Sequence, residues 1–131
     1  MDTSPATPVP ATAASTEMCS YAVDLWTSDV AILHDEPRLK SVLYAAAEAG
    51  QAIVLAEASH IFPNGAVTIS LVLSQSHLNV HTWPELKLAN IDLLTCGVLE
   101  GDTILTYLRT HLSATRCNVT RVTRDATGEP H

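Results

Sequence analysis

Apolar and polar residues alternate along residues 20–27, which is the pattern of a half-buried β-strand. After residues 35–37 (Asp-Glu-Pro), apolar side chains recur at helical spacing until Gly50. This predicts a helix with acidic residues and a proline at its start and a glycine at its end. The same spacing over residues 101–112 predicts a second helix. Further strands are predicted at residues 52–56, 66–73, 88–95 and 117–122.

The order of these elements predicts an α+β domain. Short links between consecutive strands favour antiparallel pairing, so we expect a two-layer α/β sandwich with a mainly antiparallel sheet and both helices on one face. The other face would then need a ligand or a partner to cover it. We place the domain at residues 18–124, between a disordered tail rich in Pro, Ala, Thr and Ser at residues 1–17 and a frayed tail at residues 125–131.

A polar segment at residues 74–85 interrupts the apolar pattern. It lies between the predominantly apolar runs 69–73 and 88–94, and it contains two histidines, a tryptophan and a glutamate. Polar, titratable side chains between two core strands indicate a functional site rather than an ordinary surface loop.

The composition limits the partners that the chain can have. Hydrophobic residues make up 47% of the 131 residues and charged residues 16%, which is enough apolar material for a folded core. The formal net charge of -7 argues against nucleic-acid binding, because phosphates call for a basic surface. The chain has neither a run of about 18 apolar residues nor a basic, hydrophobic leader. We therefore expect no membrane span and no signal peptide, and a cytoplasmic location.

The spacing of cysteines and histidines argues against a metal site. The three cysteines form no Cys-x-x-Cys pair, so a zinc site and a disulfide framework are both disfavoured. His77 and His81 are four residues apart, but a strand does not bring such a pair together, and no third ligand is evident. We therefore expect no bound metal.

Two motifs carry a family resemblance. Residues 75–85 read QSHLNVHTWPE and residues 92–97 read DLLTCG. At this separation they resemble the motifs of the prokaryotic S-adenosylmethionine decarboxylase proenzymes. The turn at residues 62–65 (FPNG) lies where this family has its own proline-glycine turn. The resemblance covers about residues 18–123.

The resemblance implies that the chain makes its own cofactor. In this family a serine Oγ attacks the preceding carbonyl, and elimination and hydrolysis then leave a pyruvoyl group at the new N-terminus. Carried over, the cleavage falls between Gln75 and Ser76. His81 matches the processing base, and Thr68 matches a hydroxyl that assists the same step.

The resemblance also implies the roles in turnover. The pyruvoyl carbonyl, formed from Ser76, makes a Schiff base with the substrate amine and takes up the electrons that loss of CO₂ leaves behind. Cys96 matches the proton donor of the family. The expected substrate contacts are Phe62, Leu78, Trp83 and Glu85.

The resulting hypothesis is a self-cleaving S-adenosylmethionine decarboxylase that supplies aminopropyl groups for spermidine biosynthesis. The resemblance further implies a homodimer of cleaved αβ units. Two alternatives stay open: the same chemistry on arginine or ornithine, and an unprocessed, inactive homologue that acts as a regulatory partner.

Strand geometry sets a condition on this hypothesis. Ser76 and His81 are five residues apart, so on one flat strand their side chains face opposite sides. Their meeting requires a bend or a bulge near Ser76, or release of the chain after cleavage.

Overall fold

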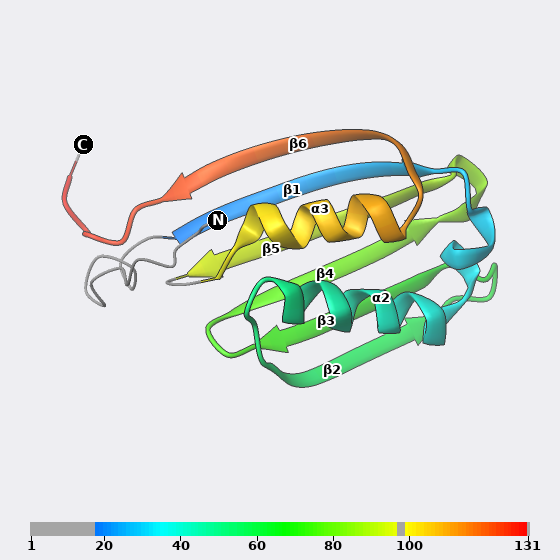
Figure 1. Ribbon diagram of the computed structural model, residues 1–131, viewed down its shortest axis with the longest axis horizontal. Helices are drawn as coiled ribbons and strands as arrows, with labels where there is room; N and C mark the ends of the chain where they lie inside the picture. The colour runs from blue at the N-terminus through cyan, green and yellow to red at the C-terminus, as the bar shows by residue number, and fades with distance from the viewer. Residues whose placement is uncertain (1–17, 97–98, 131) are drawn as a thin grey trace.

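The computed structural model describes residues 18–96 and 99–130. Its strands are β1 (Met18–Thr27), β2 (Val54–Ile61), β3 (Val67–Leu73), β4 (Ser76–Trp83), β5 (Leu88–Cys96) and β6 (Ala114–Arg124). Its helices are α2 (Glu36–Ala49) and α3 (Gly101–His111), with the short 3-10 helices η1 (Val30–His34) and η2 (Pro84–Leu86). The strands form one antiparallel sheet in the order β2-β3-β4-β5-β1-β6, and α2 and α3 lie over the same face of it (Figure 1). The predicted α+β two-layer sandwich is confirmed.

The polar segment that separates two predicted strands is itself a strand, β4. Its side chains alternate, with Leu78 and Val80 buried under the helices and His77 exposed on the opposite face. Polar residues on one face and apolar residues on the other make the segment a half-buried strand.

Two predicted strands have different bounds. The strand predicted at residues 52–56 is β2, which begins later and runs on to Ile61, and the strand predicted at 117–122 is the longer β6. Both are edge strands with mostly exposed side chains, so the apolar pattern that marks a buried strand is weak in them. The predicted tail at residues 1–17 and Gly97 of the second motif lie outside the described residues.

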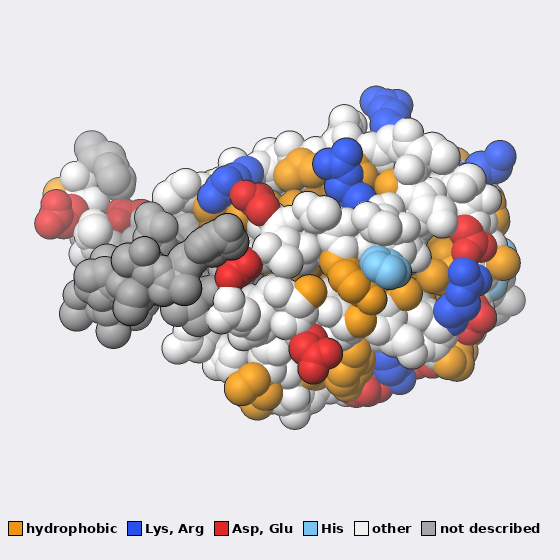
Figure 2. Space-filling view, viewed as in Figure 1, with side chains coloured by type: hydrophobic (Ala, Val, Ile, Leu, Met, Phe, Trp, Pro, Cys, Tyr) orange, Lys and Arg blue, Asp and Glu red, His pale blue; other side chains and the backbone are white. Residues whose placement is uncertain are grey.

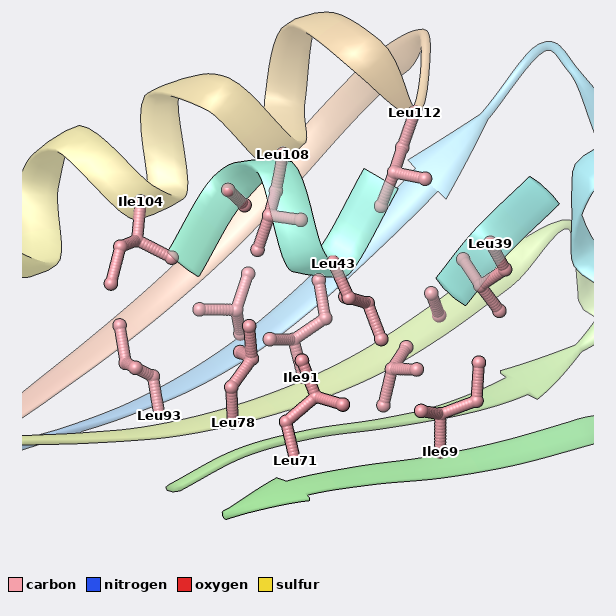
Figure 3. Close-up of a cluster of buried hydrophobic side chains, with 14 of the residues drawn as sticks. Leu39, Leu43, Ile69, Leu71, Leu78, Ile91, Leu93, Ile104, Leu108 and Leu112 are labelled. Carbon is pink, nitrogen blue, oxygen red and sulfur yellow. The ribbon is translucent and has the colours of Figure 1, made fainter. Parts of the chain in front are cut away.

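Alternation along the central strands builds the core on the helix side of the sheet. Leu71, Leu78 and Leu93 lie opposite one another on β3, β4 and β5, at most 2% exposed. Leu43 of α2 and Leu108 of α3 cover them and are fully buried (Figure 3). Burial of a side chain of this size contributes about 1.5–3 kcal/mol, so this layer supplies much of the stability.

A partly exposed cluster of charged side chains ties the edge strand β2 to α2. Lys40 Nζ lies 2.8 Å from a carboxylate oxygen of Glu36 and 2.5 Å from one of Glu57, and the Tyr44 hydroxyl donates to Glu57 at 2.5 Å. Hydrogen bonds with Glu36 and then Glu57 raise the pKa of Lys40, and the bonds from Lys40 and Tyr44 lower the pKa of Glu57. Exposed ion pairs add little stability. We therefore assign the cluster to holding in place the strand that carries His60.

The helix side of the molecule shows charges of both signs interspersed (Figure 2). Lys and Arg side chains lie among Asp and Glu side chains on this face, and they do not gather into one basic patch. No helix within the described ranges combines the length and the hydropathy that a membrane span requires.

The core prediction can be tested with two matched leucines. Leu71→Ala removes a fully buried side chain, and we expect it to lower the free energy of unfolding by about 3 kcal/mol, because it leaves a cavity. Leu55→Ala makes the same change at a side chain that is 62% exposed on β2, and we expect a change within about 0.5 kcal/mol. Urea unfolding of both variants measures the difference. Equal losses would contradict this description of the core.

Candidate active site

A row of polar side chains crosses the face of the sheet that the helices leave uncovered. Cross-strand register places one residue from each described strand in this row, in sheet order: His60, Thr68, His81, Asn90, Asp24 and Asn118. The alternation that buries the leucines on the other face puts these side chains on this one. The row contains two of the predicted site residues, Thr68 and His81.

Thr68 and His81 are in direct contact. They lie opposite each other on β3 and β4, and Thr68 Oγ1 is 2.5 Å from His81 Nδ1. A hydrogen bond at Nδ1 fixes the orientation of the imidazole ring and leaves Nε2 as the nitrogen that can accept or donate a proton elsewhere. The structure thus brings together the predicted processing base and the hydroxyl predicted to assist it.

Four rings, one of which is that of His81, form a continuous series of contacts along this face. The His60–Phe62, Phe62–His81 and His81–Trp83 ring centroids are 4.7, 5.5 and 4.6 Å apart, all in edge-to-face contact. Such pairs stabilise one another by about 0.5–1.5 kcal/mol each. Phe62 is 36% exposed and Trp83 39% exposed, so both keep free ring surface on which a flat ligand could stack.

The turn between β2 and β3 sets the position of Phe62. The Gly65 N–H donates to the Phe62 carbonyl at 2.8 Å, and the Asn64 side chain accepts from the Ala66 N–H at 3.1 Å. Gly65 has φ +89, and a Cβ there would lie 2.6 Å from His34 Nδ1, so the position requires glycine on both counts. The predicted turn therefore fixes the position of Phe62, the first of the expected aromatic substrate contacts.

A hydrogen-bonded chain links Trp83 to β5 and β1. The indole Nε1–H of Trp83 donates to Asn90 Oδ1 at 2.6 Å, and Asn90 Nδ2 donates to Asp24 Oδ1 at 2.8 Å. Trp83 is therefore held from one side by this chain and from another by the His81 ring.

Ser76 is the first residue of β4, directly after the exposed turn residues Ser74 and Gln75. Its Oγ is buried and has no hydrogen-bond partner among the residues that the structure describes. A buried hydroxyl without a partner costs about 1–3 kcal/mol, and such groups in native proteins call for a chemical explanation. The predicted cleavage site is thus the start of a strand, with its nucleophile unpaired.

Ser76 and His81 are not brought together within one chain. The pairing of β4 with β3 and β5 continues without a bulge from one residue to the other, so the two side chains point to opposite faces. The two residues are also five positions apart along the strand, which corresponds to about 16 Å. Cys96 lies at the Ser76 end, because His77 pairs with Leu94 two residues before the end of β5.

The remaining predicted site residues lie in different settings. Glu85 is exposed in η2, two residues beyond Trp83 and at the same end of the sheet. The Leu78 side chain is fully buried beneath the helices, so it belongs to the core and any contact with a substrate falls to its backbone.

Four residues of the polar row were not predicted as site residues, and His60 and Asn90 are two of them. His60 lies beyond the predicted end of its strand, so its face could not be assigned. Asn90 falls in a strand that reads as mainly apolar, although its alternation with Asp92 is a weak sign of a polar face.

Several known proteins resemble this chain in sequence. A sequence model of the family described as S-adenosylmethionine decarboxylase matches residues 20–125. An S-adenosylmethionine decarboxylase proenzyme of Methanococcus maripaludis is 39% identical over 84 residues, which are 63% of this chain and 69% of that protein. An S-adenosylmethionine decarboxylase proenzyme 2 of Bacillus cereus is 37% identical over 103 residues, which are 78% of this chain and 84% of that protein.

A solved structure has the same fold. The crystal structure of the adenosylmethionine decarboxylase from Aquifex aeolicus matches 89% of this chain and 98% of that chain with a TM-score of 0.76. At 23% sequence identity this match supports the fold alone. The match to the family model and the similarity to the sequence relatives show more than the fold: the chain belongs to the S-adenosylmethionine decarboxylase family.

Proposed function

We propose that this chain is a self-processing, pyruvoyl-dependent S-adenosylmethionine decarboxylase whose product is the aminopropyl donor for spermidine biosynthesis. The observation that carries the proposal is the Ser76 hydroxyl. It is buried and unpaired among the described residues, and it opens the strand that bears the motif of the family. Membership of the family supports S-adenosylmethionine as the substrate.

The processing step uses groups of the chain itself. Ser76 Oγ attacks the Gln75 carbonyl, and the peptide bond becomes an ester as the nitrogen is released. Removal of the Ser76 α-proton then expels the Gln75 carboxylate, and hydrolysis of the resulting imine releases ammonia and leaves the pyruvoyl group. A serine needs a base for such an attack, and His81, held by Thr68, is the candidate.

The sheet keeps the two products together after cleavage. The scissile bond lies in the turn between β3 and β4, and β4 pairs with β3 on one side and with β5 on the other. Breaking one bond at a turn removes no strand from the sheet. The new N-terminus at Ser76 is then free to move at the end of β4.

The surroundings of Ser76 fit a pyruvoyl group. The burial of the Ser76 hydroxyl limits access of water to it. Cys96 is the last residue of the neighbouring strand β5, at the same end of the sheet. When present, the pyruvoyl carbonyl supplies an electron sink for decarboxylation. We assign to the Cys96 thiol the return of a proton to the substrate α-carbon, and to Trp83 and Phe62 the stacking of a flat ring.

A homodimer would complete the site. Ser76 and Cys96 lie at one end of β4, whereas His81 and Thr68 lie toward the other, on the sheet face that no helix covers. If two subunits pack these faces together about a twofold axis, the ends exchange. This arrangement brings His81 of one subunit to the end of β4 at which Ser76 of the other lies, and Ser76 must turn from the helix side of the sheet toward the interface to meet it.

Substrate identity is tested by measuring CO₂ release from S-adenosylmethionine, arginine and ornithine in parallel. We expect release from S-adenosylmethionine only. The amino acids are not favoured, because the family model and the named relatives are those of S-adenosylmethionine decarboxylases. Release from arginine or ornithine alone would defeat the proposal.

Replacing the nucleophile should stop processing. We expect Ser76→Ala to stay uncleaved, because no hydroxyl remains to attack Gln75, whereas Ser74→Ala, an exposed serine two residues away, should cleave like the unmodified chain. Gel electrophoresis and mass spectrometry report both results. Cleavage of Ser76→Ala at the same bond would rule out this chemistry.

Cys96→Ala should separate processing from turnover. We expect cleavage to proceed and kcat to fall by about 100-fold or more, since a positioned general acid contributes on this scale. Cys117→Ala, a change at a half-buried thiol on β6, serves as the matched control and should keep its kcat. A Cys96→Ala enzyme with unchanged kcat would remove the thiol from proton transfer.

Complementation tests the shared site. We would co-express a His81→Ala chain, distinguished by a tag, with a Ser76→Ala chain. If the base acts across the dimer, the His81→Ala chain is cleaved only when the Ser76→Ala chain is present. Copurification of the two chains without any cleavage would contradict the shared site.

A further inference from the structure

We infer that Asn90 and Asp24 are positioning residues that fix the indole of Trp83, so that Trp83 offers a ligand its ring face and not its N–H. The inference rests on the proposed function for the ligand itself. Two hydrogen bonds carry it: Trp83 Nε1–H donates to Asn90 Oδ1 at 2.6 Å, and Asn90 Nδ2 donates to Asp24 Oδ1 at 2.8 Å.

The chemistry of the three groups allows only one donor-to-acceptor direction for these two hydrogen bonds. An indole N–H can only donate, and an ionised carboxylate can only accept. A side chain that bridges them must accept on one side and donate on the other, as a primary amide does. Asp24 therefore sets the orientation of the Asn90 amide, and the amide oxygen sets the direction of the Trp83 ring.

The hydrogen-bonded network of Trp83, Asn90 and Asp24 has no evident role in the core. Its members lie on the open face of the sheet, Asn90 and Asp24 are half-buried, and Trp83 is 39% exposed. A tryptophan with that much free surface could adopt other side-chain rotamers. The Asn90 bond and the edge-to-face contact with His81, at a centroid distance of 4.6 Å, hold it in one.

The consequence is a specific mode of recognition. Because Asn90 already occupies the indole N–H, Trp83 recognises a ligand by stacking, which suits a planar heterocycle. A preset ring also avoids the entropy cost of ordering the side chain on binding. Loss of these two hydrogen bonds should therefore weaken substrate binding and leave the chemical step intact.

The test has two arms, and the first needs no substrate. In a Trp26→Phe background, Trp83 is the remaining one of two tryptophans and reports its own fluorescence. We expect Asn90→Leu, which is similar in shape but removes the amide, to shift the emission maximum and lower the anisotropy. Asp24→Leu removes the acceptor of the Asn90 amide and should change both values in the same direction, whereas Asp24→Asn retains an acceptor and should stay close to the unmodified protein. Asn118→Leu makes the same substitution on the far side of Asp24 and should change neither value.

The second arm measures kinetics with S-adenosylmethionine. For Asn90→Leu we expect cleavage as before, a KM raised about twofold to tenfold, and a kcat within about twofold. Unchanged fluorescence in Asn90→Leu, or an effect on KM no larger than in Asn118→Leu, would overturn the inference. If the unmodified protein does not decarboxylate S-adenosylmethionine, the proposed function fails, and the fluorescence arm alone decides whether the pair positions Trp83.

Discussion

The uninterrupted pairing of β4 with both of its neighbours is the constraint on which the rest of the structure depends. Since β4 has no bulge, its side chains alternate strictly between two faces. Leu78 and Val80 enter the core beneath the helices, and His81 joins the polar row on the other side. A slip by one residue would expose the leucine and bury the histidine. Core packing therefore determines which residues can form the site.

The same constraint separates the groups that the chemistry needs. Ser76 stands at one end of β4, and its buried hydroxyl has no hydrogen-bond partner within the described part of the chain, while His81 and its partner Thr68 lie about 16 Å away along the sheet and on the opposite face. A strand anchored on both sides cannot bend to join them. In the homodimer that we propose, a second subunit covers the open face and brings its His81 to this end of the strand, and Ser76 must turn from the helix side toward that face to meet it.

The sequence predicts the elements that local chemistry controls. α2 begins and ends near its predicted limits because Asp35 accepts a hydrogen bond from the Arg38 N–H and Gly50 closes the last turn. The two motifs make Ser76, His81 and Cys96 candidates for the site, because these residues lie in long, unusual strings that resemble those of the family. The Thr68–His81 contact is also foreseen, since the resemblance assigns both residues to one step.

Features that depend on register between strands could not be predicted. His60 and Asn90 join the polar row through pairing with distant segments, and nothing near them in the chain indicates a role. The edge strands β2 and β6 are exposed, so their apolar pattern does not mark their ends. The burial of Leu78 likewise follows from the tertiary packing of a segment whose motif reads as a site.

The proposed function requires that the chain cuts itself before Ser76 and converts that serine into a pyruvoyl group. Mass spectrometry of the purified, unmodified chain tests it most directly. We expect two fragments, residues 1–75 and 76–131, with the second lighter than a fragment that begins with serine by the mass of one ammonia molecule and blocked to Edman degradation. A chain that stays whole, or a second fragment with an intact N-terminal serine, would show that no pyruvoyl group forms.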